Sequence, residues 1–456
     1  MIRALALLTL FALAACATPS ANAPVERLAP DAIALPPMKQ FGPPHSDRPA
    51  RSNRSIETDI LDLTFRLESG RELPIFSRFE GPITVRVVGR APPYLHADLD
   101  RLLVRLRREA GIDISKVGPK DPASITIEVL SRSDLQRAVP QAACFVVPRM
   151  TSWGEFRRNR RSAQLDWTTL ELREKMAIFL PGDVSPQEIR DCLHEELAQA
   201  IGPLNDLYRL SDSVFNDDNF HTVLTGFDML VLRTLYATEL RSGMTRAEVA
   251  VRLPGILDRL NPAGRNAPDG VGTATPRTWI NAIETALGPR TPPSRRRLAA
   301  RQAVEIAQAQ GWTDARAGFS LYALGRLSIV AEPELAMAAF LQSGSVYRQS
   351  TSTDLHAAHV AMQLAAFALS AGQADIAIDI VDRNLRPVAR AENAALLSTL
   401  MMVKAEALEL KGDKATARKV REDALGWARY GFGSDAEVRA RYSEIAALAP
   451  DRIQGS

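Results

Sequence analysis

One stretch of the chain, residues 185–218, combines strong helix signals with the densest set of acid, amide and thiol side chains. Ser185 is a typical N-cap, Pro186 suits the first helical position, and Glu188 follows the cap by three residues. Gly202 and the proline after it end the helical pattern. The stretch therefore predicts a helix that begins after Ser185 and ends near Gly202.

The predicted helix has two faces of different character, because successive side chains are separated by about 100°. The residues of its apolar face are Ile189, Leu193, Leu197 and Ala200. The residues of its polar face are Glu188, Cys192, Glu195 and Gln199. We expect the apolar face to lie in a core and the polar face to border any functional site.

The N-terminus has the pattern of a bacterial lipoprotein signal. Arg3 precedes an apolar run at 4–13 that is too short to span a membrane as a mature helix. The run ends in Leu-Ala-Ala-Cys at 13–16, which resembles the lipobox, so we expect 1–15 to be a signal peptide and Cys16 to carry lipid. An ordinary signal peptide with an incidental cysteine is the alternative.

The predicted lipid determines the expected location. Alanine rather than aspartate follows Cys16, which by analogy with such lipoproteins fits sorting to the outer membrane, with the protein body in the periplasm. No later apolar run is long enough to cross a bilayer, so we expect the lipid to be the only membrane attachment.

The two remaining cysteines are Cys144 and Cys192. In an oxidising periplasm, such a pair is most simply explained by one disulfide. The alternative is a catalytic thiol at Cys192 beside His194. Side chains two positions apart on a helix do not face each other, which argues against that alternative.

The mature chain divides into four predicted parts. Residues 16–55 are rich in proline and poor in aromatic residues, which indicates a tether. Residues 56–260 alternate strand and helix patterns, which indicates an α+β domain. Residues 261–297 form a linker rich in Pro, Gly and Arg around a short helix expected near 279–287. Residues 298–450 are entirely helical in pattern. The strands are expected at 83–88, 125–130, 144–147 and 176–180, and a long helix is expected at 222–240.

The helical part repeats with a period of about 40 residues. Gly372 and Gly412 each follow the end of a helix pattern, and Ala377 and Ala417 correspond at the same spacing. A poorer third copy lies at 331–336. Helix pairs with small residues at the crossing and glycine in the turn are typical of a tetratricopeptide-like solenoid, with a plain helical bundle as the alternative. We expect a protein or peptide partner to bind its concave face.

Charge and motifs exclude two classes of function. The net charge is +3, and the arginine clusters at 157–161 and 295–297 are not interleaved with stacking aromatic residues, so no nucleic-acid partner is expected. The chain has no glycine-rich phosphate loop and no Walker-type lysine, so no nucleotide is expected.

The predicted helix carries the spacing of a metallopeptidase motif with altered ligands. The zincin register that starts at His194 fails, because residue 198 is alanine. Shifting by one residue aligns Glu195, Glu196, Gln199, Gly202 and Asn205 with the metzincin pattern His-Glu-x-x-His-x-x-Gly-x-x-His/Asp. The ligand positions, including the neighbouring Asp206, offer only oxygen donors, which suit a hard cation better than zinc.

The chain resembles the domain-of-unknown-function family 2927 over nearly all of its mature length. The segments that carry the resemblance are LDLTFRLESGRELPIFSRFEGPITVRVVG, RDCLHEELAQAIGPLNDLYRLSDSVFNDDNFHTVLTGFDMLVLR and GWARYGFG. The family comprises uncharacterised Gram-negative secreted proteins and lipoproteins thought to be related to zincin peptidases. The resemblance implies a zincin-like fold at 56–260 and a periplasmic lipoprotein, and it implies no particular activity.

Two functions follow from these observations. The first is a non-catalytic protein-interaction or envelope-assembly module, with a degenerate zincin-like domain and no certain cofactor. The alternative is a divergent metallopeptidase in which Glu196 acts as general base. In that case the divalent metal would be held by Glu195, Gln199, Asn205 and Asp206.

Overall fold

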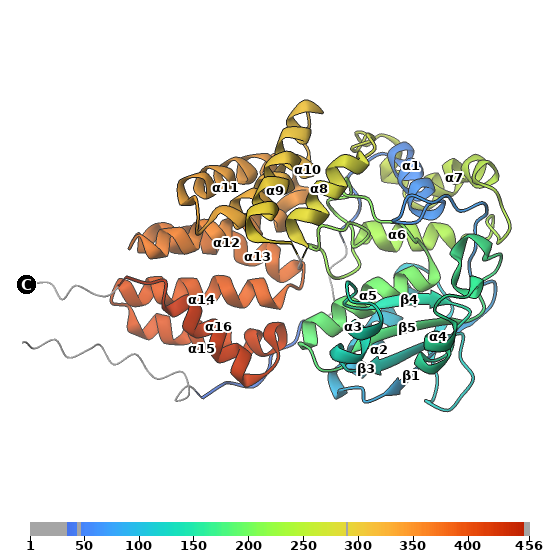
Figure 1. Ribbon diagram of the computed structural model, residues 1–456, viewed down its shortest axis with the longest axis horizontal. Coiled ribbons are helices and arrows are strands. Elements are labelled where there is room, and N and C mark those ends of the chain that lie inside the picture. Colours follow the sequence, from blue (N-terminus) through green and yellow to red (C-terminus); the bar gives the residue numbers. More distant parts are fainter. Residues whose placement is uncertain (1–33, 43–46, 289–290, 451–456) are drawn as a thin grey trace, which may run out of the picture.

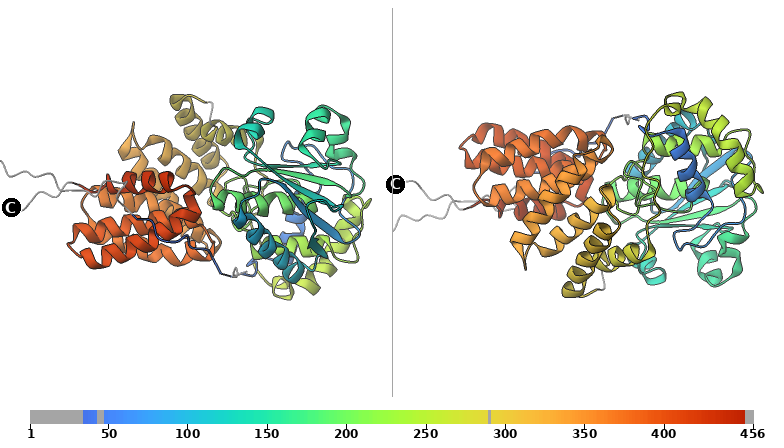
Figure 2. Two further views of the ribbon diagram at one scale, coloured as in Figure 1. Left: turned by 90° about the horizontal axis from the view of Figure 1, so that it is seen from below. Right: turned by 90° about the horizontal axis from the view of Figure 1, so that it is seen from above.

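The computed structural model describes residues 34–42, 47–288 and 291–450. The predicted signal peptide and Cys16 lie outside these ranges. The described chain forms an α+β domain beside an all-helical region (Figures 1 and 2), which confirms the predicted fold class in outline. Within the described ranges, no helix has the length and apolar character needed to cross a membrane.

A five-stranded sheet with the strand order β2-β1-β3-β5-β4 forms the centre of the N-terminal domain. The β4 strand lies at one edge and is antiparallel to β5, whereas the other neighbours are parallel. The strands are β1 (Ile83–Gly89), β2 (Ile114–Lys116), β3 (Ile125–Leu130), β4 (Phe145–Pro148) and β5 (Met176–Pro181). The sequence pattern predicts four of them and misses β2, which is too short to show an alternation.

Helices cover both faces of the sheet (Figure 1). The helices of this domain are α1 (Asn53–Thr64), α2 (Pro93–Glu109), α3 (Arg132–Ala138), α4 (Trp153–Asn159), α5 (Pro186–Ile201), α6 (Gly226–Leu235) and α7 (Arg246–Leu260). Successive residues of β5 enter opposite cores, as the pleat requires. Met176 and Ile178 pack in the larger core with α2 and α5, whereas Ala177 and Phe179 pack in the smaller core with α3 and α4.

The C-terminal region consists of helices that pack as consecutive hairpins. Its helices are α8 (Arg277–Leu287), α9 (Pro293–Ala309), α10 (Ala315–Ser328), α11 (Pro333–Tyr347), α12 (Asp354–Ser370), α13 (Ala374–Arg390), α14 (Ala394–Leu410), α15 (Lys414–Phe432) and α16 (Asp435–Ala446). Short 3₁₀ helices are η2 (Ala163–Leu165), η3 (Trp167–Thr169), η4 (Pro262–Arg265) and η5 (Thr351–Thr353).

The predicted repeat is visible in the turns and crossings of these hairpins. Gly372 and Gly412 follow α12 and α14 with φ of 71° and 86°, the left-handed conformation that favours glycine after a helix. Ala336, Ala377 and Ala417 occupy matching positions on α11, α13 and α15 and are fully buried. Small side chains at these positions let the paired helices approach closely.

The structure differs from the predicted tether and linker. The described end of the tether packs on the protein body, where Phe41 stacks on Trp427 of α15 at a centroid distance of 4.4 Å and the Lys39 amide donates to the Gly426 carbonyl. The predicted linker contains α8, whose Trp279 lies fully buried in the helical core. The composition of these Pro-rich segments does not predict either contact, because each segment contains few large apolar side chains.

Helix α5 contacts the helical region through buried polar groups. Arg190 pairs with Glu392 in the turn between α13 and α14, with 3.1 Å between Nη1 and Oε2. The Ala395 amide at the start of α14 donates to Gln187 at 2.9 Å. The helical region is therefore a partner of the N-terminal domain within the same chain.

Removing the guanidinium of Arg190 should uncouple the two domains. Arg190 and Glu392 have side-chain exposures of only 4% and 12%, so Arg190→Ala leaves a buried carboxylate without its cation. We expect the free energy of unfolding in urea to fall by about 3–5 kcal/mol and the unfolding curve to split into two transitions. The control is Arg132→Ala, which breaks an exposed ion pair with Glu188 and should cost less than about 1 kcal/mol. Equal effects of the two variants would contradict this account of the interface.

Candidate functional site

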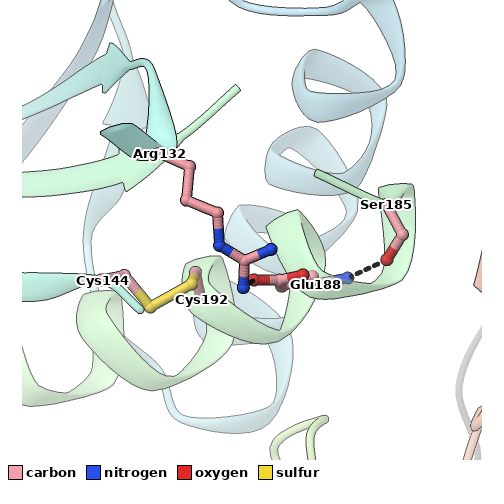
Figure 3. The surroundings of a disulfide bond; sticks show 5 residues. All are labelled: Arg132, Cys144, Ser185, Glu188 and Cys192. Carbon is pink, nitrogen blue, oxygen red and sulfur yellow. Dashed lines mark hydrogen bonds and ion pairs between the residues drawn. A yellow bond between two sulfur atoms is a disulfide. The ribbon is translucent and has the colours of Figure 1, made fainter. Parts of the chain in front are cut away.

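Helix α5 begins and ends where the sequence predicts (Figure 3). Ser185 is the N-cap, and its hydroxyl accepts a hydrogen bond from the Glu188 amide at 3.1 Å, with Pro186 in the first turn. Gly202 is the C-cap, but its φ of −145° is outside the left-handed region. A Cβ atom there would lie 2.6 Å from Cδ2 of Leu232, so Gly202 provides space for helix packing rather than a left-handed turn.

The disulfide ties α5 to the edge of the sheet. Cys192 on α5 is bonded to Cys144, which immediately precedes β4 (Figure 3). This bond confirms the predicted pairing and removes Cys192 as a thiol nucleophile. The apolar residues of α5 predicted to lie in the core are fully buried: Ile189, Leu193, Leu197 and Ala200.

Glu195 and Glu196 form a close acidic pair on α5. Among the described residues, their carboxylates and the Cys144 sulfur form a group whose atoms lie within 4.8 Å of one another. The sulfur belongs to the disulfide and offers no thiolate. This donor set does not fit a catalytic zinc centre, which takes three protein ligands, usually imidazole, thiolate or carboxylate.

The raised pKa of Glu196 opposes the role of general base. Burial, reinforced by the charges of Glu195 and Glu68, raises the pKa of Glu196 well above its usual range. The main chain of Val146 in β4 lowers it only in part. A raised pKa disfavours the ionised carboxylate that a general base needs in order to accept a proton from water.

The other predicted ligands lie near α5 but have structural partners. The Asn205 side-chain amide donates to the main-chain carbonyl of Asp62 in α1 at 2.9 Å, and the main-chain carbonyl of Gln199 accepts from Arg173 at 2.7 Å. Burial raises the pKa of Asp206 well above its usual range, with further contributions from neighbouring acids. Metal binding by Gln199, Asn205 and Asp206 stays a prediction.

A second cluster, formed by histidine, aspartate and phenylalanine side chains from distant parts of the sequence, lies across the domain boundary. The Nε2 atom of His356 on α12 lies 2.9 Å from a carboxylate oxygen of Asp218. The ring of Phe220 packs between His356 and His359, at centroid distances of 4.5 and 4.6 Å. The His-x-x-His spacing is visible in the sequence, but only the fold brings the acidic loop to it.

The start of α6 also differs from the prediction. The sequence places a helix at 222–240 with Asp217 or Asp218 at its N-terminal end. In the structure α6 spans Gly226–Leu235, and its N-cap is Thr225, which forms a capping box with Asp228. Asp218 is consequently available to the histidine cluster.

A cavity of about 730 Å³ lies where the two domains meet. Its floor is the polar face of α5, with Glu188, Asp191 and Glu195. Its opposite wall comes from the helical region and includes Met362 and Leu396. The floor could be found from the sequence, because its acids recur on one face of the predicted helix. The wall residues Met362 and Leu396 are more than 150 residues away in the chain and give no such indication.

Two acids on the cavity floor have strongly raised pKa values. Burial, followed by the charges of Glu68, Asp217 and Asp191, raises the pKa of Glu195 to about 7. Burial raises the pKa of Asp191 to about 7 as well, although Arg190 opposes the shift. Both groups therefore change charge near neutral pH.

The disulfide gives a simple chemical prediction. Under denaturing, non-reducing conditions, thiol titration should find no free thiol at Cys144 or Cys192. Cys192→Ala should lower the free energy of unfolding by about 2–4 kcal/mol, because it releases a loop with a sequence separation of 48. The matched control is wild-type protein under reducing conditions, which should lose a similar amount. Two reactive thiols in the native preparation would refute the bond.

The raised pKa values predict a loss of stability with rising pH. Glu195 and Asp191 bind protons in the native state that the unfolded chain has already released, so the native state is favoured at low pH. We expect the free energy of unfolding to fall by about 1–3 kcal/mol from about pH 6 to about 8.5, and Glu195→Gln to reduce this slope. Exposed Glu422→Gln is the control and should leave the slope unchanged. A wild-type stability that rises over this range would contradict the assignment.

Comparison with known proteins gives a family and no function. Residues 53–255 match the family model described as "Protein of unknown function (DUF2927)". No curated protein and no solved structure matches the chain. The matched residues contain the five-stranded sheet, α5 and both disulfide cysteines. The N-terminal domain of this chain therefore belongs to the DUF2927 family of proteins of unknown function.

Proposed function

We propose that this protein is a lipid-anchored periplasmic binding protein, most simply attached to the outer membrane, that holds part of a protein partner in the cavity between its two domains. The cavity of about 730 Å³ is the observation that carries the proposal. Ligand sites are typically concave spaces of about 300–1,000 Å³ that combine apolar walls with a few polar groups. The protein acts as an interaction or envelope-assembly module and catalyses no reaction.

The packing of the helical region supports a site at the domain boundary. Phe220 of the N-terminal domain packs against Phe319 and Tyr322 of α10, and Tyr208 packs against Trp279 of α8. This part of the helical surface is already covered by the chain itself. The cavity that a partner segment can enter lies beside this aromatic contact, between α5 and the helical region.

The predicted location is supported by the chemistry of the cysteines. A disulfide between Cys144 and Cys192 is compatible with the oxidising periplasm. The lipid anchor at Cys16 rests on the Leu-Ala-Ala-Cys pattern at 13–16. Both features fit a secreted bacterial lipoprotein.

A divergent zincin-like metallopeptidase is the second candidate function. The close pair Glu195–Glu196, placed about two turns before Gly202 at the end of α5, is the observation that favours it. Val214 lines the cavity, and it belongs to the segment Ser213-Val214-Phe215, which weakly resembles the methionine turn of metzincins. The donor set and the raised pKa of Glu196 argue against this function.

Metal content separates the two functions. Protein purified without added metal should contain substoichiometric zinc, manganese and calcium, and its stability should be indifferent to a chelator. Stoichiometric metal that disappears in Glu195→Ala, but remains in the control Glu422→Ala, would favour the peptidase. The physical reason for the expected result is the small number of converging ligands.

Blocking the cavity tests the binding site itself. A neutral apolar dye, Nile red, should bind the full chain saturably, with fluorescence enhancement as the readout. Ala366→Trp places a large side chain on the cavity wall and should lower the dye affinity by about tenfold or more. Val330→Trp, at a position that is 96% exposed, is the matched control and should bind normally. Unchanged binding by Ala366→Trp would refute the cavity as the site.

A further inference from the structure

The floor of the interdomain cavity carries one carboxylate whose charge is not compensated. Glu188 pairs with Arg132 at 3.0 Å, and Asp191 lies 3.7 Å from Arg190. No described residue forms an ion pair with Glu195, and the charged groups that act on it are all acids. Glu195 therefore presents a negative potential to the cavity when it is ionised.

A buried, unsatisfied acid lies directly beside Glu195. The Glu196 side chain is only 4% exposed, and its Oε2 atom has no hydrogen-bond partner among the described residues. The two carboxylates approach each other within 4.8 Å. Glu195 lines the cavity whereas Glu196 does not, so a cation in the cavity would donate to Glu195 and would also reduce the repulsion between the two acids.

The basic groups that line the cavity do not supply that cation. Arg441 is held by Glu444 at 3.0 Å. His221 and His359 are neutral near pH 7, because burial lowers their pKa values to about 4 and about 3. The cavity is therefore acidic overall, with its focus at Glu195.

The opposite wall combines apolar side chains with neutral amides. Met362 and Phe367 of α12, Leu396 of α14 and Phe432 of α15 line it. Gln363 lines it as well and carries both a donor and an acceptor. Main-chain peptide groups need such paired partners, whereas a simple alkylamine does not.

We propose that the segment bound in this cavity is a basic peptide, with a lysine or arginine side chain at Glu195 and apolar neighbours against α12 and α14. This inference rests on the proposed function, which makes the cavity a binding site. The cationic side chain donates to the Glu195 carboxylate, and such charge-assisted hydrogen bonds are stronger than neutral ones. The apolar wall holds the residues that flank the basic one.

The charge preference can be measured with two peptides that differ only in the ammonium group. The probes are acetyl-Leu-Lys-Leu-amide and the same peptide with norleucine in place of lysine. In calorimetric titrations of the full chain at pH 7, we expect the lysine peptide to bind about tenfold more tightly or better. The difference should shrink with added salt, because part of it is electrostatic. Equal affinities would overturn the inference.

Variants connect the preference to the named residues. Glu195→Gln keeps the side-chain shape and should bring the two affinities together, whereas Glu422→Gln should preserve their ratio. Circular dichroism of both variants checks that they are folded. A lysine preference that survives in folded Glu195→Gln would overturn the assignment to this residue. Pentylamine that binds as tightly as the lysine peptide would overturn the peptide part of the proposal.

The outcomes distinguish this inference from the proposed function. Ala366→Trp should weaken both peptides, and a lysine peptide that binds this variant normally would contradict the cavity itself. If Nile red binding depends on the cavity but neither peptide binds, the proposed site stands and the basic-peptide inference fails.

Discussion

The relative position of the two domains depends on the buried ion pair between Arg190 of α5 and Glu392 in the α13–α14 turn. Each charge needs the other, because neither is well solvated. Glu392 also has a φ of 54°, whereas the matching turns of the neighbouring hairpins have Gly372 and Gly412. A glutamate occupies a position that favours glycine because its side chain reaches α5. This contact, together with the Gln187 hydrogen bonds and the aromatic packing of Tyr208 and Phe220, holds the helical wall of the cavity over α5.

Features encoded by neighbouring residues could be predicted from the sequence, and features produced by packing between distant segments could not. The Ser185 cap, the apolar face of α5 and the left-handed Gly372 and Gly412 are local signals, and the structure contains them. The packing of Phe41 on α15 and the pairing of His356 with Asp218 join residues far apart in the chain. Contacts between distant segments leave no periodic pattern in the sequence, so the cavity and the histidine cluster could be identified only from the folded structure.

The cavity walls make binding and domain docking interdependent. The inner helices α10, α12 and α14 face the N-terminal domain, and Phe220 fills part of the space between them. A ligand that touches both α5 and α12 would stabilise the docked arrangement in proportion to its occupancy. At low pH, the histidines at this boundary destabilise the docked arrangement of the two domains. His221 and His359 are buried and neutral, so their protonation on opening favours separation of the domains as the pH falls below about 6.5.

Helix α5 has the residue spacing of a metallopeptidase motif but no imidazole ligands. Its acidic side chains, Glu195 and Glu196, suit a cationic group of a partner better than a catalytic metal. A bound metal would neutralise carboxylates gathered there, but Glu195 and Glu196 lack a converging third protein ligand among the described His, Cys, Asp and Glu side chains. Burial and the neighbouring acids instead raise the pKa values of both groups and so disfavour their charged forms. A basic side chain from a partner would supply the positive charge directly and favour ionisation of both acids. In the proposed function, the position that holds a metal in a peptidase therefore holds the cationic group of a peptide.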